Sequence, residues 1–142
     1  MKSNTILVVE DNEDDAFFMT RTFQDMGILN PVQIVEDGQQ AVDYLAGKGA
    51  FKERANFPPP MIVFLDLKLP FISGHDVLSW IRRQAEFEKL VVVVLTSSNE
   101  PVDLTRAYRA GANSYVVKPA TQDQLSELAK SFNLRWMRRD KS

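Results

Sequence analysis

Short, almost purely apolar runs alternate along the chain with longer stretches in which apolar residues recur every three or four positions. The short runs have the length and composition of strands that are buried on both faces, as in a parallel sheet flanked by helices. The pattern predicts five such strands, at Thr5–Val9, Val32–Val35, Met61–Leu65, Leu90–Leu95 and Ser114–Val117.

The longer stretches predict a helix after each strand, at about residues 13–27, 38–47, 76–88 and 100–110 and from residue 121 onward. In the first helix, Phe17, Phe18, Met19 and Phe23 are expected to form the apolar face. Thr121, three residues before a glutamine, has the spacing of a capping box at the start of the last helix. Strict alternation of strands and helices predicts an α/β fold, a (βα)5 doubly wound, five-stranded parallel sheet.

Length and composition limit the classes of function. With 142 residues, the chain is expected to be a single domain over residues 1–142, without an output domain. A net charge of −2 gives no general attraction to nucleic acid or to an anionic membrane. No apolar run approaches the roughly 20 residues that span a bilayer, so a cytoplasmic protein is expected. The absence of cysteine and the single histidine, His75, exclude thiolate nucleophiles and multi-histidine metal sites.

Polar side chains stand where four of the predicted strands end. Glu10 and Asp11 follow the first strand, Asp66 the third, Thr96 the fourth and Lys118 the fifth. Asp66 alone would be read as an ordinary turn residue, since aspartate is common in turns. Right-handed crossovers, however, bring all carboxyl ends of a parallel sheet to one edge, where ligands bind in open α/β folds. The five side chains together therefore predict a site.

The chemistry of these side chains is specific. Three carboxylates without histidine or thiol form a hard oxygen site that suits Mg²⁺. A carboxylate beside Mg²⁺, facing a hydroxyl and an ammonium group, is arranged as a nucleophile toward a phosphoryl group. Mg²⁺, Thr96 and Lys118 would then share the negative charge of the phosphoryl oxygens.

The chain resembles a known family, the receiver domains of two-component response regulators, along nearly its whole length. The matching motifs are Val9-Glu10-Asp11-Asn12, Leu65-Asp66, Leu69-Pro70, Ser73-Gly74, Leu95-Thr96-Ser97, Ala110-Gly111-Ala112, Tyr115 and Lys118-Pro119. The resemblance implies a flavodoxin-like strand order, 2-1-3-4-5. It also implies a phosphoprotein that takes part in a phosphorelay and controls a partner-binding surface.

The resemblance further implies a role for each matching residue. Asp66 would accept a phosphoryl group from a histidine kinase or a phosphotransfer protein. Glu10, Asp11, Asp66 and the backbone carbonyl of Lys68 would hold Mg²⁺. Thr96 and Tyr115 would form the switch pair. Lys118, preceding a cis-proline, would hold the phosphoryl oxygens.

Two features depart from the common pattern of the family. The connection over residues 48–60 is long and ends in three prolines, which resembles stand-alone receivers that accompany phytochrome-type histidine kinases. Lys68 stands two residues after the acceptor, where the family varies and where hydrolysis of the phosphoryl group is tuned. The sequence does not decide the oligomeric state and leaves open whether the chain forms a homodimer.

Two other classes of protein compete with this interpretation. A Mg²⁺-dependent phosphatase with an aspartyl nucleophile would have a second aspartate at the position of Lys68, so that residue argues against it. A degenerate receiver, which binds partners without phosphorylation, is disfavoured by the intact set of polar strand ends. His75 is expected on the surface, whereas Trp80 and Trp136 have the spacing of core residues.

Overall fold

The computed structural model describes residues 3–97 and 100–138. Within these ranges the chain forms one parallel sheet with strand order β2-β1-β3-β4-β5, which confirms the fold class and the strand order. The strands are β1 (Ile6–Val9), β2 (Val32–Val35), β3 (Ile62–Asp66), β4 (Val91–Thr96) and β5 (Ser114–Val117).

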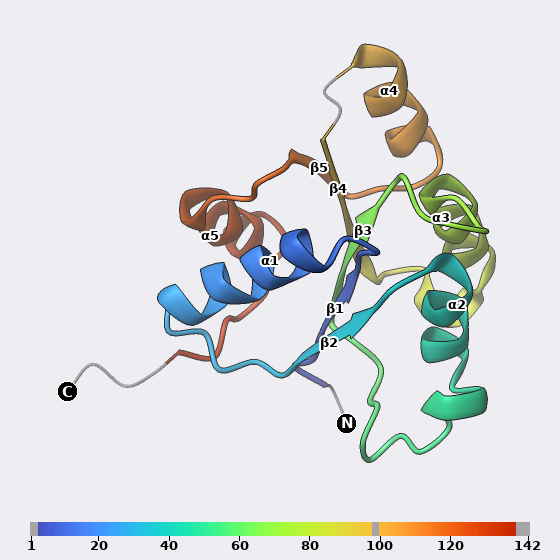
Figure 1. The fold of residues 1–142 in the computed structure, drawn as a ribbon, viewed down its shortest axis with the longest axis horizontal. Coiled ribbons are helices and arrows are strands. Elements are labelled where there is room, and N and C mark those ends of the chain that lie inside the picture. The colour runs from blue at the N-terminus through green and yellow to red at the C-terminus, as the bar shows by residue number, and fades with distance from the viewer. Residues whose placement is uncertain (1–2, 98–99, 139–142) are drawn as a thin grey trace.

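Helices cover both faces of the sheet. In Figure 1, α1 and α5 lie on one side of the strands and α2 and α3 on the other, with α4 at the top of the view. The helices are α1 (Glu13–Asp25), α2 (Gly38–Ala46), α3 (Gly74–Arg83), α4 (Pro101–Arg109) and α5 (Gln122–Ser131). Two short 3-10 turns, Gly49–Phe51 and Ala85–Phe87, follow α2 and α3.

Each face of the sheet has its own apolar core, because successive residues of a strand point to opposite faces. Ile6 and Val8 of β1 belong to the core beneath α1 and α5, whereas Leu7 and Val9 belong to the core beneath α2 and α3. Since both faces are buried, β1, β3 and β4 are nearly continuous apolar runs, which explains why their sequence signal is clear.

Helix ends differ from the prediction where a cap or a turn decides them. The third helix begins at Gly74, two residues early, because the Ser73 hydroxyl accepts a hydrogen bond from the backbone N–H of Asp76 and caps it. The same helix ends at Arg83, since Gln84 has an extended backbone, and residues 85–87 form a separate turn. The capping box predicted at Thr121 is present.

The predicted apolar face of the first helix is partly wrong. Phe17 is 67% exposed and Phe18 is 57% exposed, whereas Ala16, Met19 and Phe23 are buried. With 3.6 residues per turn, positions 16, 19 and 23 form one stripe, and the two phenylalanines flank it on the solvent side. Helix α1 therefore presents two aromatic rings outward, beside the end of β1.

The residues after α5 run back to the segment that follows α1, where Arg138 forms an isolated antiparallel bridge with Ile28. Trp136 is buried, as predicted for a core residue, but it follows the helix instead of belonging to it. Its indole N–H donates to the carbonyl of Leu125 over 3.0 Å, and its ring packs against Phe23. Trp80 is half-buried against the other core. Among the described helices, none has the length and apolar character needed to cross a membrane.

Candidate functional site: an acidic cleft at the carboxyl edge of the sheet

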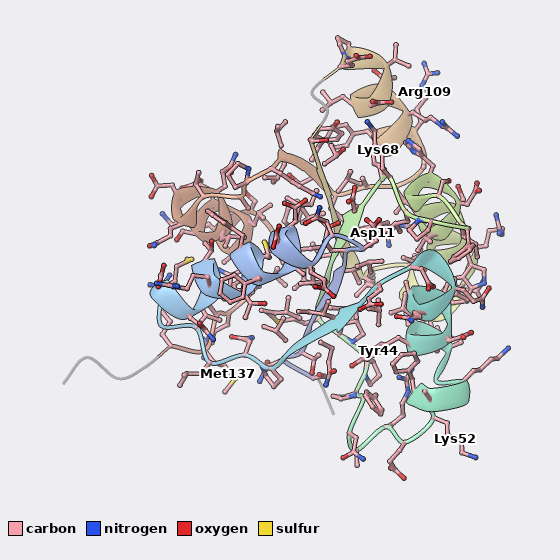
Figure 2. The ribbon with its side chains drawn as sticks, in the orientation of Figure 1. Asp11, Tyr44, Lys52, Lys68, Arg109 and Met137 are labelled. Carbon is pink, nitrogen blue, oxygen red and sulfur yellow. The ribbon has the colours of Figure 1, made fainter. Side chains whose placement is uncertain are left out.

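Four adjacent strands deliver the predicted polar residues to one edge of the sheet. Asp66 and Thr96 are the last residues of β3 and β4, while Glu10 directly follows β1 and Lys118 directly follows β5. Glu10, Asp66 and Thr96 are buried, and Asp11 is exposed at the mouth of the cleft (Figure 2). The strand order therefore brings together the residues that the sequence predicted as a site.

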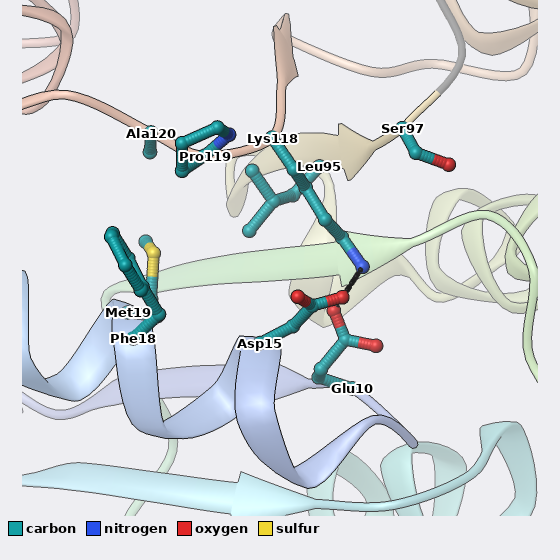
Figure 3. Close-up of a pocket in the computed structure, with 9 residues that line it drawn as sticks. All are labelled: Glu10, Asp15, Phe18, Met19, Leu95, Ser97, Lys118, Pro119 and Ala120. Carbon is teal, nitrogen blue, oxygen red and sulfur yellow. Dashed lines mark hydrogen bonds and ion pairs between the residues drawn. The ribbon is translucent and has the colours of Figure 1, made fainter.

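Lys118 is the centre of the charge network. Its Nζ donates to Oδ2 of Asp66 and to Oδ2 of Asp15, each over 2.9 Å, and forms an ion pair with Glu10. Figure 3 shows the side chain reaching down from the end of β5 to Glu10 and to Asp15 on the first turn of α1. The peptide bond between Lys118 and Pro119 is cis, as predicted.

Asp15 is a member of this network that the sequence interpretation missed. It lies four residues after Asp11, in the first turn of α1, and its carboxylate pairs with Lys118. The sequence contained an indication of this role: α1 starts at the carboxyl edge, so an acidic side chain in its first turn can face the cleft.

Burial and charge change the ionisation of two groups in the cleft. Burial, together with the hydrogen bond and the negative charge of Asp66, raises the pKa of Glu10 to about 7, against the opposing effect of Lys118. Burial by itself lowers the pKa of Lys118, but hydrogen bonds to Glu10, Asp15 and Asp66 outweigh it and raise the pKa above its usual value. The lysine therefore remains charged, while the carboxylates repel one another.

This repulsion fits a cation site. Carboxylate oxygens of Glu10, Asp11 and Asp66 lie within 4.8 Å of one another. Three carboxylates at this spacing, one of them with a raised pKa, form an oxygen-only ligand set of the kind that hard divalent cations prefer. The second oxygen of Asp66, Oδ1, accepts a hydrogen bond from the backbone N–H of Lys68 over 3.0 Å, which fixes the orientation of this carboxylate.

The cleft continues into two grooves, one on each side of α1. The first has a volume of about 350 Å³ and runs from Glu10 and Lys118 to an apolar wall that includes Phe18 (Figure 3). The second, about 390 Å³, runs between α1 and β2 and is lined by Phe17 and Ile34 beside acidic residues. Each exposed phenylalanine of α1 thus borders a groove that opens toward the carboxylates.

Other residues singled out in the sequence lie around the cleft or away from it. Tyr115 is half-buried, and in the β4–β5 register it lies opposite Val94, two residues before Thr96. The side chain of Lys68 is exposed. His75 is 8% exposed, so its expected surface position is wrong. Burial and the positive charge of Arg106 lower its pKa, although Asp103 and Asp76 oppose this.

Comparison with known proteins agrees with this geometry. The model of the response regulator receiver domain matches residues 6–130. The probable methanogenesis regulatory protein FilR2 of Methanothrix harundinacea is 37% identical over 132 residues, which cover 93% of this chain and 83% of that protein.

Two solved structures have the same fold. The bacteriophytochrome response regulator AtBRR is 34% identical, with a TM-score of 0.84, over 99% of this chain and 100% of that one. The Mn²⁺-bound form of the response regulator Rcp1 is 28% identical, with a TM-score of 0.77, over 96% and 99% of the two chains. A protein of that name from Synechocystis sp. is also a sequence relative, 29% identical over 132 residues.

Proposed function

Since the chain belongs to the receiver domains of response regulators, which act in two-component signalling, we propose that Asp66 is its phosphoacceptor. The donor would be a histidine kinase or a phosphotransfer protein, and the reaction would depend on Mg²⁺. The observation that carries this proposal is the environment of Asp66, which ends a central strand within reach of Lys118 and of two further carboxylates.

The proposed reaction is a phosphoryl transfer between two side chains. A carboxylate oxygen of Asp66 attacks the phosphorus, the bond to the imidazole nitrogen of the donor breaks, and the bonding electrons return to that nitrogen. The product is an acyl phosphate on Asp66. Mg²⁺ held by Glu10, Asp11 and Asp66 would supply positive charge to the phosphoryl oxygens. The carbonyl of Lys68 is proposed as a further ligand.

Lys118 is positioned to bind the transferred phosphoryl group. Its ammonium is 2.9 Å from Oδ2 of Asp66 and is shared with two other carboxylates. When Asp66 is phosphorylated, the negative charge lies farther out, on the phosphoryl oxygens, and Lys118 can follow it by a change of rotamer. Charge-assisted hydrogen bonds of this kind are stronger than neutral ones.

The proposed output is a change at the surface formed by α4, β5 and α5. Thr96 would donate its hydroxyl to a phosphoryl oxygen, and the ring of Tyr115 would turn inward in response. A small local shift can bias a two-state surface in this way. Beryllofluoride, which mimics the phosphoryl group, should perturb NMR signals of residues 100–117 beyond the cleft. Changes confined to the carboxylate ligands would contradict the switch.

A kinase of the phytochrome type is the proposed donor. Support comes from the similarity of the chain to a bacteriophytochrome response regulator over nearly the full length of both chains. The exposed rings of Phe17 and Phe18, which border the two grooves leading to the carboxylates, suit an apolar contact with the donor.

The experiment that tests the proposed function uses a small phosphodonor. Incubation with acetyl phosphate and Mg²⁺ should add one phosphoryl group per chain, measured by intact-protein mass spectrometry. Asp66→Asn should abolish the addition, and Asp25→Asn, at the far end of α1, should leave it unchanged. Undiminished phosphorylation of Asp66→Asn would contradict the proposal.

A further inference from the structure

The loop between β3 and α3 carries an exposed aromatic residue in an unusual backbone conformation. Phe71 is 90% exposed and has a φ of 69°. The N–H of Ile72 donates to the carbonyl of Pro70 over 2.8 Å, so Phe71 is the central residue of a γ-turn. With positive φ this turn is rare and strained, because the Cβ of an L-residue crowds the backbone.

The rest of the loop forces this conformation on Phe71. Ile72 packs against α2 so closely that a Cβ at Gly38 would lie 2.7 Å from the Ile72 carbonyl oxygen and 2.8 Å from its Cβ. At the other side, the N–H of Gly74 donates to the carbonyl of Leu67 over 2.9 Å. With both flanks fixed and the φ of Pro70 restricted by its ring, the turn is held in place by its surroundings.

Neither packing nor backbone preference explains a phenylalanine at this position. The ring is almost completely solvent-exposed, so it contributes little to either core, and glycine would adopt the same φ without strain. A strained residue that presents an apolar ring to water is a candidate for a contact with another molecule. Since Phe71 follows Asp66 by five residues, that contact lies at the carboxyl edge, beside the cleft.

We infer that Phe71 is an anchor for the histidine-bearing domain of the phosphodonor, which would receive the ring in an apolar pocket bordered by lysine or arginine. The inference rests on the proposed role of Asp66. A donor must bring its phosphohistidine to Asp66 and therefore covers this edge of the sheet.

The charge of the rim supports this choice of partner. The carboxyl edge exposes several acidic side chains, and Glu36 and Asp37 directly precede the Gly38 that Ile72 touches. The exposed acidic residues at this edge include Asp11, Glu13, Asp14, Glu36 and, in the first turn of α3, Asp76, while Lys68 in the same loop as Phe71 is exposed and basic. A basic border around the partner's pocket would complement this rim, whereas a second copy of this chain would bring the same acidic rim against it.

The test separates the ring from the backbone strain. Phe71→Ala removes the ring and keeps the strain, Phe71→Gly removes both, and Phe71→Tyr keeps an aromatic ring. Leu29→Ala, which truncates an exposed apolar residue at the opposite edge of the sheet, is the matched control. The donor is the autophosphorylated histidine kinase that phosphorylates the parent chain fastest when the kinases of the source organism are screened with it.

Truncation of an anchor commonly costs a large part of the affinity of an interface. We therefore expect phosphotransfer at limiting chain concentration to be about tenfold slower for both Phe71→Ala and Phe71→Gly, and near the parental rate for Phe71→Tyr and Leu29→Ala. Phosphorylation by acetyl phosphate should be equal in all five proteins. Phe71→Gly should melt no lower than Phe71→Ala, since it relieves the strain.

Unchanged transfer from the kinase to Phe71→Ala and Phe71→Gly would overturn the inference and leave the proposed function intact. An equal loss with acetyl phosphate and with the kinase would also overturn it, because the residue would then act on the cleft itself. If the parent chain accepted no phosphoryl group from either donor, that result would contradict the proposed function itself, and with it the inference about Phe71. A rate that decreases as salt increases would support the basic border, and a salt-independent rate would contradict it.

Discussion

The two edges of the sheet use charged side chains in opposite ways. At the carboxyl edge, Glu10, Asp66 and Lys118 are gathered with more negative charge than their one lysine can neutralise. At the amino edge, Arg82 and Arg54 each donate to several backbone carbonyls. Figure 2 shows Asp11 and Lys68 at the first edge and Tyr44, Lys52 and Met137 toward the second.

Arg82 illustrates the amino edge. Its guanidinium donates to the carbonyls of Gly111 and Phe87 over 2.9 Å and to Oδ1 of Asn113 over 2.8 Å, which ties α3 to the start of β5. Arg54 in turn donates to the carbonyls of Tyr44, Leu45 and Phe57 and so anchors the long connection before β3.

The two edges therefore contribute differently to the stability of the fold. Satisfied hydrogen bonds at the amino edge contribute stability, whereas excess negative charge and a strained turn at the carboxyl edge reduce it. Unfavourable interactions of this kind persist where a ligand relieves them. The predictions below change one edge at a time.

The largest effect on stability is expected at the amino edge. Arg82→Ala should lower the free energy of unfolding by about 3 kcal/mol, because it removes the guanidinium's hydrogen bonds to Gly111, Phe87 and Asn113. Urea denaturation measures this loss. Arg83→Ala, the exposed neighbour, should change stability by less than about 0.5 kcal/mol. Phosphorylation of folded Arg82→Ala by acetyl phosphate should equal that of the parent. A loss of phosphorylation would contradict the claim that the amino edge serves stability alone.

The second prediction removes one carboxylate from the cleft. Asp11→Ala should be about 1 kcal/mol more stable than the parent in the presence of a chelator, since the remaining carboxylates repel each other less. It should also lose most of the rise in melting temperature that Mg²⁺ gives the parent by mass action. Thermal melts with and without Mg²⁺ measure both effects, with Asp14→Ala as the control. An undiminished Mg²⁺ response would place the metal elsewhere.

The third prediction concerns pH and follows from the raised pKa of Glu10. In the unfolded chain this carboxyl has its ordinary pKa of 4.5, and in the folded chain its pKa is about 7. The stability that it contributes in the protonated form is therefore complete below pH 4.5 and is lost as pH rises through 7. Without metal, Glu10→Gln should lack this loss, which is about 3 kcal/mol at most in the parent.

Melting temperatures of the parent and Glu10→Gln between pH 4.5 and pH 7 give the comparison, and Glu36→Gln, an exposed carboxylate, is the control. A constant difference between parent and variant over this range would mean that Glu10 does not titrate there.

The smallest effect is expected at Lys68, whose exposed side chain follows the acceptor by two residues. Its ammonium is expected to pair with a phosphoryl oxygen and to obstruct the attack of water. An exposed charge pair is worth about 0–1 kcal/mol, so Lys68→Ala should lose its phosphoryl group a few times faster than the parent. Phosphate release after removal of the donor measures the rate, with Lys89→Ala as the control. A decay that is unchanged or slower would refute this role.

The sequence predicted the sheet and the strand ends well because both follow from simple patterns. Buried strands are continuous apolar runs, and the polar residue that ends each run falls at the carboxyl edge by topology alone. Asp66 and Lys118 could therefore be assigned to one cleft although 52 positions separate them.

Features that depend on three-dimensional contacts were harder to predict. His75 was expected on the surface because it is polar and follows a turn, yet it precedes the buried Leu78 by three residues and lies on the same stripe of α3. The strain at Phe71 arises from contacts of its neighbours with Gly38 and with the end of β3, which no local pattern reveals. Phe17 and Phe18 were misassigned because hydrophobicity alone does not identify the buried stripe.

The most direct measurement is the location of the phosphoryl group in the chain. Borohydride reduces an acyl phosphate, so an aspartate that carried the phosphoryl group becomes homoserine, which tandem mass spectrometry of the digested protein can assign to a position. After treatment with acetyl phosphate and Mg²⁺, homoserine is predicted at position 66. Reduction at Asp11 or Asp15 instead, with Asp66 unmodified, would contradict the assignment of Asp66 as the acceptor.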